Sequence, residues 1–162
     1  MTVSVKFKFW FYANYWWVVG LALMLSLTYF WAEGTPSQVA IPAVATLLSL
    51  IYFLQKQKIE ELRLFREIFA ECNSRYDEMN ENLNKIINCT TENLADAEKE
   101  VLINYFNLCG EEYLYYKHGY IYPDVWRAWS NGIRFYLNDD RIKTFWICEL
   151  ESNSYYGVPK DL

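Results

Sequence analysis

The chain has 162 residues and a formal net charge of −5 at pH 7. Residues 56–162 carry 13 basic and 19 acidic side chains, a formal charge of −6, without a cluster of five basic residues. This balance excludes a broad nucleic-acid-binding surface, which needs Lys and Arg to neutralise phosphates, and favours a protein partner with a basic patch. The mean hydropathy of −0.09 conceals a sharp division, because two segments near the N-terminus contain no charge.

The first uncharged segment covers residues 9–31. At about 1.5 Å per helical residue it is roughly 34 Å long, enough to cross a hydrocarbon core of about 30 Å. The second, residues 39–55, supplies only roughly 25 Å, so this span must include flanking residues or thin the bilayer. A soluble domain of this size could not bury two helices that are apolar all round. We therefore expect a transmembrane hairpin over residues 9–55, with spans at about 9–31 and 37–55.

Charges that flank the two spans predict their orientation. Lys6 and Lys8 precede the first span, and four basic residues follow the second within residues 56–66. The connecting loop contains Glu33 and neither Lys nor Arg. The positive-inside rule therefore places both termini in the cytoplasm. Small residues in the spans permit close contact between helices, and the candidates for membrane helix packing are Gly20, Ala22, Ser26, Ala43, Ala45 and Ser49.

Residues 56–88 carry an apolar repeat with alternating steps of three and four, which predicts a helix with a heptad seam. No strong breaker separates it from the second span, so one long helix is expected. The seam packs either against its own domain or against other protomers. Aromatic and Cys residues in the seam favour the first alternative. Its members are Leu62, Phe65, Phe69, Cys72, Tyr76, Met79, Leu83 and Ile86.

The sequence Asn-Cys-Thr-Thr at 88–91 ends this helix, and a second cytoplasmic helix is expected from Glu92 or Asp96 to His118. Gly119 then occupies the position after the helix, where a left-handed conformation is common. On a helical wheel this helix has one apolar face, with Leu102, Tyr105, Phe106, Cys109, Tyr113 and Tyr116.

Two more helices follow. Pro123 suits the first turn of a helix over residues 123–137, and Asp139 or Asp140 caps a short last helix. No strand pattern is evident. The predicted fold is all-α: a two-helix transmembrane hairpin followed by a small cytoplasmic helical domain over residues 56–162.

The residues do not favour an enzyme or a metal site. Glu111 and Glu112 are the only suggestive carboxylate pair, and neighbours on a helix point about 100° apart. His118 has no evident nucleophile beside it, and phosphate-loop and hydrolase motifs are absent. The four cysteines, which are far apart in the sequence on the predicted reducing side, are Cys72, Cys89, Cys109 and Cys148. We expect them to behave as small buried apolar residues, and we expect neither a metal nor a cofactor.

Polar and aromatic residues on the cytoplasmic helices are the candidates for partner binding. Asparagine is a weak helix former, so its frequency here needs a reason. The polar series forms either a hydrogen-bonded network between helices or a recognition surface. The aromatic residues form either core or an interface. The candidates are Arg75, Tyr76, Asn80, Asn84, Asn104, Asn107, Glu111, Glu112, Tyr116, Tyr120, Trp126, Trp129, Tyr155 and Tyr156.

Four motifs within residues 65–157 carry a resemblance. They are RYDxMNxxLN from Arg75, YFNLCxEEY from Tyr105, YKHGYIxPxVWxxWxxG from Tyr116 and SYYG from Ser154. This pattern resembles a family of small bacterial proteins. Such domains behind two membrane helices look like membrane effectors of anti-phage systems, including those encoded beside retron reverse transcriptases.

The resemblance implies a toxin at the bacterial inner membrane, held inactive by a partner such as a reverse transcriptase–nucleic acid complex. Its release would let oligomerised hairpins disturb the lipid bilayer. A passive anchor or adaptor that localises a protein complex is the alternative function, and a homo-oligomer is compatible with either.

Overall fold

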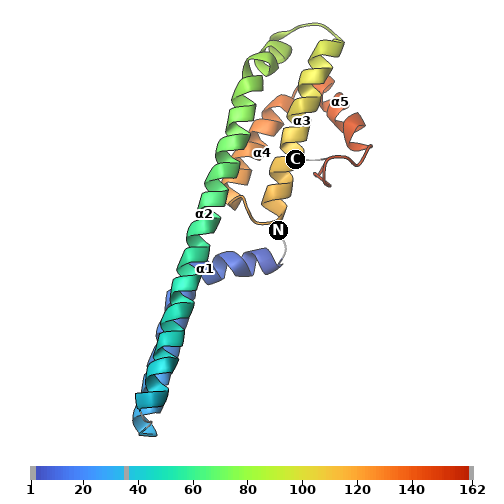
Figure 1. Ribbon diagram of the computed structural model, residues 1–162. Helices are drawn as coiled ribbons and strands as arrows, with labels where there is room; N and C mark the ends of the chain where they lie inside the picture. Colours follow the sequence, from blue (N-terminus) through green and yellow to red (C-terminus); the bar gives the residue numbers. More distant parts are fainter. Residues whose placement is uncertain (1–2, 35–36, 161–162) are drawn as a thin grey trace. The chain divides into compact units, whose positions relative to one another are not determined.

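The computed structural model describes the backbone of residues 3–34 and 37–160, and within these ranges it leaves out the side chains of 3, 4, 9 and 37–40. The described chain is helical and contains no strand, which confirms the all-α prediction. The chain forms two compact units, residues 2–64 and 65–162, here called the N-terminal and C-terminal units. Figure 1 shows the helices, which are α1 (Val3–Ala32), α2 (Ser37–Asn88), α3 (Asp96–Lys117), α4 (Pro123–Leu137) and α5 (Asp140–Leu150).

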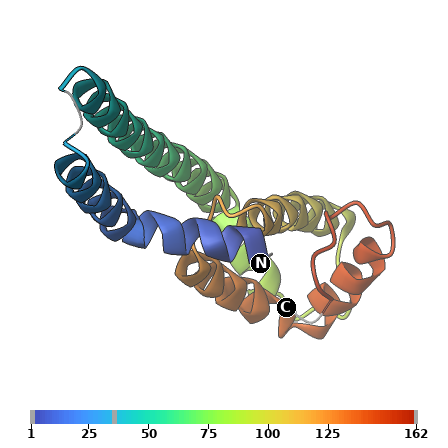
Figure 2. The same ribbon diagram turned by 90° about the horizontal axis from the view of Figure 1, so that it is seen from below.

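In the N-terminal unit, α1 lies beside the first part of α2 (Figures 1 and 2). Within the part of the chain that the structure describes, one helical segment, Trp10–Ala32, is long and apolar enough to cross a membrane. The predicted second span begins at residues 37–40, whose side chains lie outside the described ones. One membrane-spanning helix is thus supported by length and composition, and the hairpin of two spans stays a prediction.

Polar contacts join α1 to α2 near one end of this helix pair. The Lys8 Nζ atom lies 3.1 Å from Glu61 Oε1, and the Tyr12 hydroxyl donates to the same oxygen at 3.2 Å. The Lys58 ammonium lies 5.7 Å from the centroid of the Tyr15 ring. These contacts place charged groups beside the aromatic end of the apolar segment.

The six predicted helix-packing residues fall into two groups. Ala22, Ser26 and Ala43 are half-buried within the N-terminal unit. Gly20, Ala45 and Ser49 are exposed, because they lie on other faces of the same helices. The exposed group therefore presents surface that lipid or another molecule can contact.

The C-terminal unit is a helical bundle in which the second part of α2 packs with α3, α4 and α5. Phe65, Tyr76 and Met79 are half-buried against the core, and Cys72 is buried within it. The heptad seam from Phe65 onward therefore packs against its own domain, as the aromatic residues in it indicated. The buried core of the unit consists of Ile68, Cys72, Leu83, Ile86, Leu102, Tyr105, Phe106, Leu108, Cys109, Ile121, Ile133, Tyr136, Ile142, Trp146, Leu150, Tyr155 and Val158.

The predicted helix ends agree with the structure. Asp96 begins α3, and Gly119 follows the helix with a φ of 77°, a left-handed conformation that glycine adopts at little cost. Pro123 occupies the first turn of α4. Asp139 caps α5, since its Oδ1 atom accepts hydrogen bonds from the backbone N–H groups of Arg141 at 2.9 Å and of Ile142 at 3.4 Å.

The Asp139 cap also holds Arg141 in place. The Arg141 guanidinium bonds the Asp139 carboxylate and donates to the backbone oxygens of Ile86 at 2.9 Å and Thr91 at 3.0 Å. These bonds connect the start of α5 to the end of α2 and the loop after it. Hydrogen bonding with Arg141 keeps the pKa of the Asp139 carboxyl below its usual value.

We expect Asp139→Ala to lower the free energy of unfolding by about 1–2 kcal/mol, because it removes a helix cap and the partner of Arg141. Asp140→Ala is the matched control, since Asp140 is exposed and follows the cap position. Urea unfolding of the full chain in detergent micelles measures both. Equal losses for the two variants would contradict the role of the cap.

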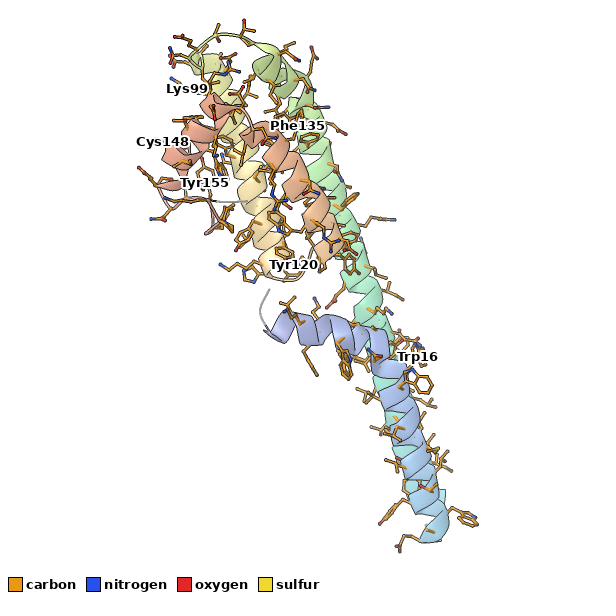
Figure 3. The ribbon with its side chains drawn as sticks, turned by 180° about the vertical axis from the view of Figure 1, so that it is seen from behind. Trp16, Lys99, Tyr120, Phe135, Cys148 and Tyr155 are labelled. Carbon is orange, nitrogen blue, oxygen red and sulfur yellow. The ribbon has the colours of Figure 1, made fainter. Side chains whose placement is uncertain are left out.

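The cysteine prediction is correct for two residues only. Cys72 and Cys109 are buried, whereas Cys89 is half-buried and Cys148 is exposed. On α5 the buried positions are Ile142, Trp146 and Leu150, one helical turn apart. Cys148 lies between two of them in sequence and therefore on the outer face of the helix (Figure 3).

Candidate functional site

A polar groove of about 380 Å³ lies between α2 and α3 in the C-terminal unit. Residues from α2 line one side at helical spacing, and residues from α3 line the other. Four of the lining residues belong to the series predicted from the sequence. We call this site the α2–α3 groove; its lining residues are Arg75, Glu78, Met79, Asn104, Asn107 and Glu111.

An ion pair between the two helices is part of the groove. Arg75 Nη1 lies 2.5 Å from Glu111 Oε2, and Nη2 lies 3.2 Å from Oε1, so the guanidinium and the carboxylate meet through two bonds. About a third of each side chain is exposed, 35% and 30%. The hydrogen bonds to Glu111 raise the pKa of Arg75 above its usual value. The pair therefore connects α2 to α3, and each charge compensates the other.

The remaining polar groups of the groove are available for binding. Asn104 and Asn107 are exposed, and their carboxamides make no hydrogen bond to any described residue. Glu78 is also exposed, and its carboxylate forms no ion pair within the described residues. The packing of the domain does not use these groups, so they can exchange water for the polar groups of a ligand.

Asn80 and Asn84 have a different role. The Tyr76 and Tyr136 hydroxyls lie 3.0 Å apart, and Asn80 Oδ1 accepts from Asn84 Nδ2 at 2.9 Å and from the Tyr76 hydroxyl at 3.4 Å. Burial raises the pKa of the Tyr136 hydroxyl. This network joins α2 to α4, so the structural interpretation of the asparagines applies here, whereas the recognition interpretation stays a prediction for Asn104 and Asn107.

Glu112 does not lie on a surface, which corrects the prediction that it contacts a partner. Its side chain is only 7% exposed, because it is one position beyond Glu111 and turns toward the core. Burial raises the pKa of this carboxyl to about 8, although the nearby Arg75 charge acts in the opposite direction. Glu112 is thus a buried acid behind the groove.

Most of the predicted aromatic residues contribute to packing rather than to the groove. The rings of Tyr116 and Trp126 stack with centroids 5.2 Å apart, and Trp129 stacks on Phe69 at 5.7 Å. Tyr155 is 4% exposed and belongs to the core, which corrects its assignment to a binding surface. Tyr120 and Tyr156 are exposed at 43% and 49%, on surfaces outside the groove lining.

Glu78 lines the groove but was not among the residues predicted from the sequence. Glu78 follows Arg75 by three positions and therefore lies on the same helix face, a signal that was available. Met79 was predicted only as part of the apolar seam. No group of three potential ligands within the described residues is arranged to hold a metal ion.

A second, larger depression of about 710 Å³ lies between the start of α3 and α5, where Lys99 and Cys148 are labelled in Figure 3. The Arg141 charge within it is already paired with Asp139 and two backbone oxygens. Three other polar side chains of the depression, Glu92, Asn93 and Asp140, have no partner among the described residues, as in the α2–α3 groove. We prefer the groove as the candidate functional site because four of its lining residues were predicted from the sequence.

Comparisons with known proteins do not assign a function to this chain. No family model, no curated protein and no solved structure matches the chain. Functional reasoning therefore rests on the apolar helix of the N-terminal unit and on the groove of the C-terminal unit.

Proposed function

We propose that the chain is a membrane-anchored effector of a bacterial anti-phage defence system, held inactive by a protein partner at the α2–α3 groove. The observation that carries the proposal is the continuity of α2, Ser37–Asn88, which contains both the predicted second span and one side of the groove. An event at the groove therefore acts on the same helix that enters the bilayer.

In this proposal residues 9–55 form a hairpin in the inner membrane, with both termini in the cytoplasm. Release of the partner lets hairpins from several chains associate and disturb the bilayer. Gly20, Ala45 and Ser49 support this step, because they are exposed small residues that allow close approach of another helix. The motif resemblance supports a partner that contains a reverse transcriptase and its nucleic acid.

A passive membrane anchor or adaptor is the second candidate. The unpaired groups of the groove favour a docking function in both cases. The two candidates differ in whether the membrane segment itself acts on the bilayer.

Induced expression of the chain without its partner tests the proposal. We expect loss of membrane potential, followed by growth arrest, measured with a potential-sensitive dye. The test variant is Ala45→Leu with Ser49→Leu, which adds bulk to the exposed helix face without adding charge. We expect this variant to reach the membrane at the same level and to leave the potential intact.

One result would count against the effector, and another would count against the role of its small residues. One is an intact membrane potential in cells that carry the wild-type chain at the same membrane level, even after phage challenge. The other is equal depolarisation by the wild type and the double leucine variant. The first result would leave the adaptor as the better account, and the second would remove the small residues from the mechanism.

A further inference from the structure

The α2–α3 groove presents hydrogen-bond acceptors that no described residue uses. They are the Glu78 carboxylate and the carboxamide oxygens of Asn104 and Asn107. A guanidinium group carries five N–H donors in a rigid, planar arrangement and no acceptor. We infer that the groove binds an arginine side chain of the partner protein. The inference rests on the proposed function for its biological meaning, since it names the chemistry of that partner.

The charge of the groove fits a cation. Arg75 is paired through two bonds with Glu111, so these two charges compensate each other. Glu78 is left with an uncompensated negative charge. Residues 65–162 carry 10 basic and 17 acidic side chains, so the surrounding unit also attracts cations. A carboxylate or phosphate ligand would be repelled by the uncompensated charge of Glu78.

The groove also has a surface for the aliphatic part of arginine. Met79 is half-buried in its lining, and a thioether side chain adapts its shape to an apolar neighbour. Arginine commonly places its methylene groups on apolar surface while its charged end contacts polar groups. A volume of about 380 Å³ lies at the lower end of ligand pockets, which suits one side chain and its flanking backbone.

Arginine is favoured over lysine for a geometric reason. The acceptors come from two helices, with Glu78 on α2 and the two asparagines on α3. The flat guanidinium can donate to several acceptors at once in fixed directions, whereas an ammonium is a compact and strongly hydrated charge. The groove should therefore distinguish the two cations.

Peptide titration of the full chain in detergent micelles tests the inference by nuclear magnetic resonance. The probe is a capped Gly-Gly-Arg-Gly-Gly peptide, and the readout is the side-chain amide signals of ¹⁵N-labelled asparagines. We expect the Asn104 and Asn107 signals to shift saturably. The same peptide with citrulline, which has nearly the same shape and no charge, should bind at least about tenfold more weakly than the arginine peptide. The lysine peptide should bind about threefold more weakly than the arginine peptide.

A pair of variants separates the groove from general attraction by charge. Glu78→Gln removes the uncompensated charge of the groove and should weaken arginine binding about tenfold. Glu151→Gln removes one exposed charge at the end of α5, away from the groove lining, and should leave the affinity within about twofold. Backbone signals of both variants show whether the fold is kept.

Equal binding of arginine and citrulline peptides, equal binding of arginine and lysine peptides, or equal losses for the two variants would overturn the inference. These outcomes are separate from the test of the proposed function. A chain that binds the arginine peptide but leaves the membrane potential intact would contradict only the effector. A chain that depolarises the membrane without binding the peptide would contradict only the arginine site.

Discussion

Replacement of Phe106 by alanine is expected to lower the free energy of unfolding of the C-terminal unit by about 3–5 kcal/mol. Phe106 is 1% exposed on α3, and its ring packs edge-on against Trp146 of α5 with centroids 4.7 Å apart. Phe145 adds a second ring at 5.8 Å. Removal of the Phe106 ring leaves a cavity between α3 and α5, which rigid helices fill only in part.

Phe135→Ala is the matched control for this prediction. Phe135, labelled in Figure 3, is 57% exposed on α4, and its ring centroid lies 5.4 Å from that of the neighbouring Tyr136. Its loss should cost less than about 1 kcal/mol, because little apolar area returns to water. Urea unfolding of each full-length variant in micelles, followed by near-ultraviolet circular dichroism, measures both. Similar losses for Phe106→Ala and Phe135→Ala would contradict the packing described here.

The ends of the helices could be predicted from the sequence because local chemistry sets them. Pro123 and the capping Asp139 lie on either side of α4, and both act within one turn of the chain. Gly119 directly follows α3, and its left-handed conformation ends that helix for a similar local reason. The apolar seam of α2 was also readable, since its period of three and four is a property of a single helix.

Contacts between helices could be predicted only in part. Arg75 and Glu111 were both singled out, but their pairing depends on the register of α2 against α3, which no local pattern gives. Gly110 lies inside α3, where glycine is a weak helix former, and the helix pattern alone does not show what packs against it. A Cβ atom there would lie 3.5 Å from Tyr155 Cα, an ordinary van der Waals contact, so the C-terminal tail packs on α3 at this position.

Glu112 shows where a sequence signal was present but was outweighed. Tyr105, Cys109, Glu112 and Tyr116 follow one another at steps of four, three and four, which places Glu112 on the inner face of α3. Its acidic side chain nevertheless favoured the prediction of a surface position, because glutamate is rarely buried without a partner. The structure resolves the conflict by burial of the carboxyl, and the cost of that burial depends on its protonation.

The buried position of Glu112 gives the chain a pH-dependent stability. Burial raises the pKa of this carboxyl from 4.5 to about 8, Glu111 acts in the same direction, and Arg75 acts against it. Between these two values the folded state binds a proton that the unfolded state releases. The free energy of unfolding therefore falls as the pH rises through this window, and it is highest where Glu112 is neutral in both states.

We expect Glu112→Gln to remove most of this dependence, because glutamine is close to the protonated acid in shape and cannot ionise. Each pKa unit corresponds to about 1.4 kcal/mol, so at pH 9 the variant should be more stable than the wild type by a few kcal/mol, with near equality at pH 4.5. Urea unfolding of the full chain in micelles at both pH values measures the difference. Glu151→Gln, which removes an exposed charge, should keep the wild-type slope. If Glu112→Gln keeps the wild-type slope, or is the less stable chain at pH 9, then the Glu112 carboxyl is not the buried neutral acid described here, and another group carries the dependence.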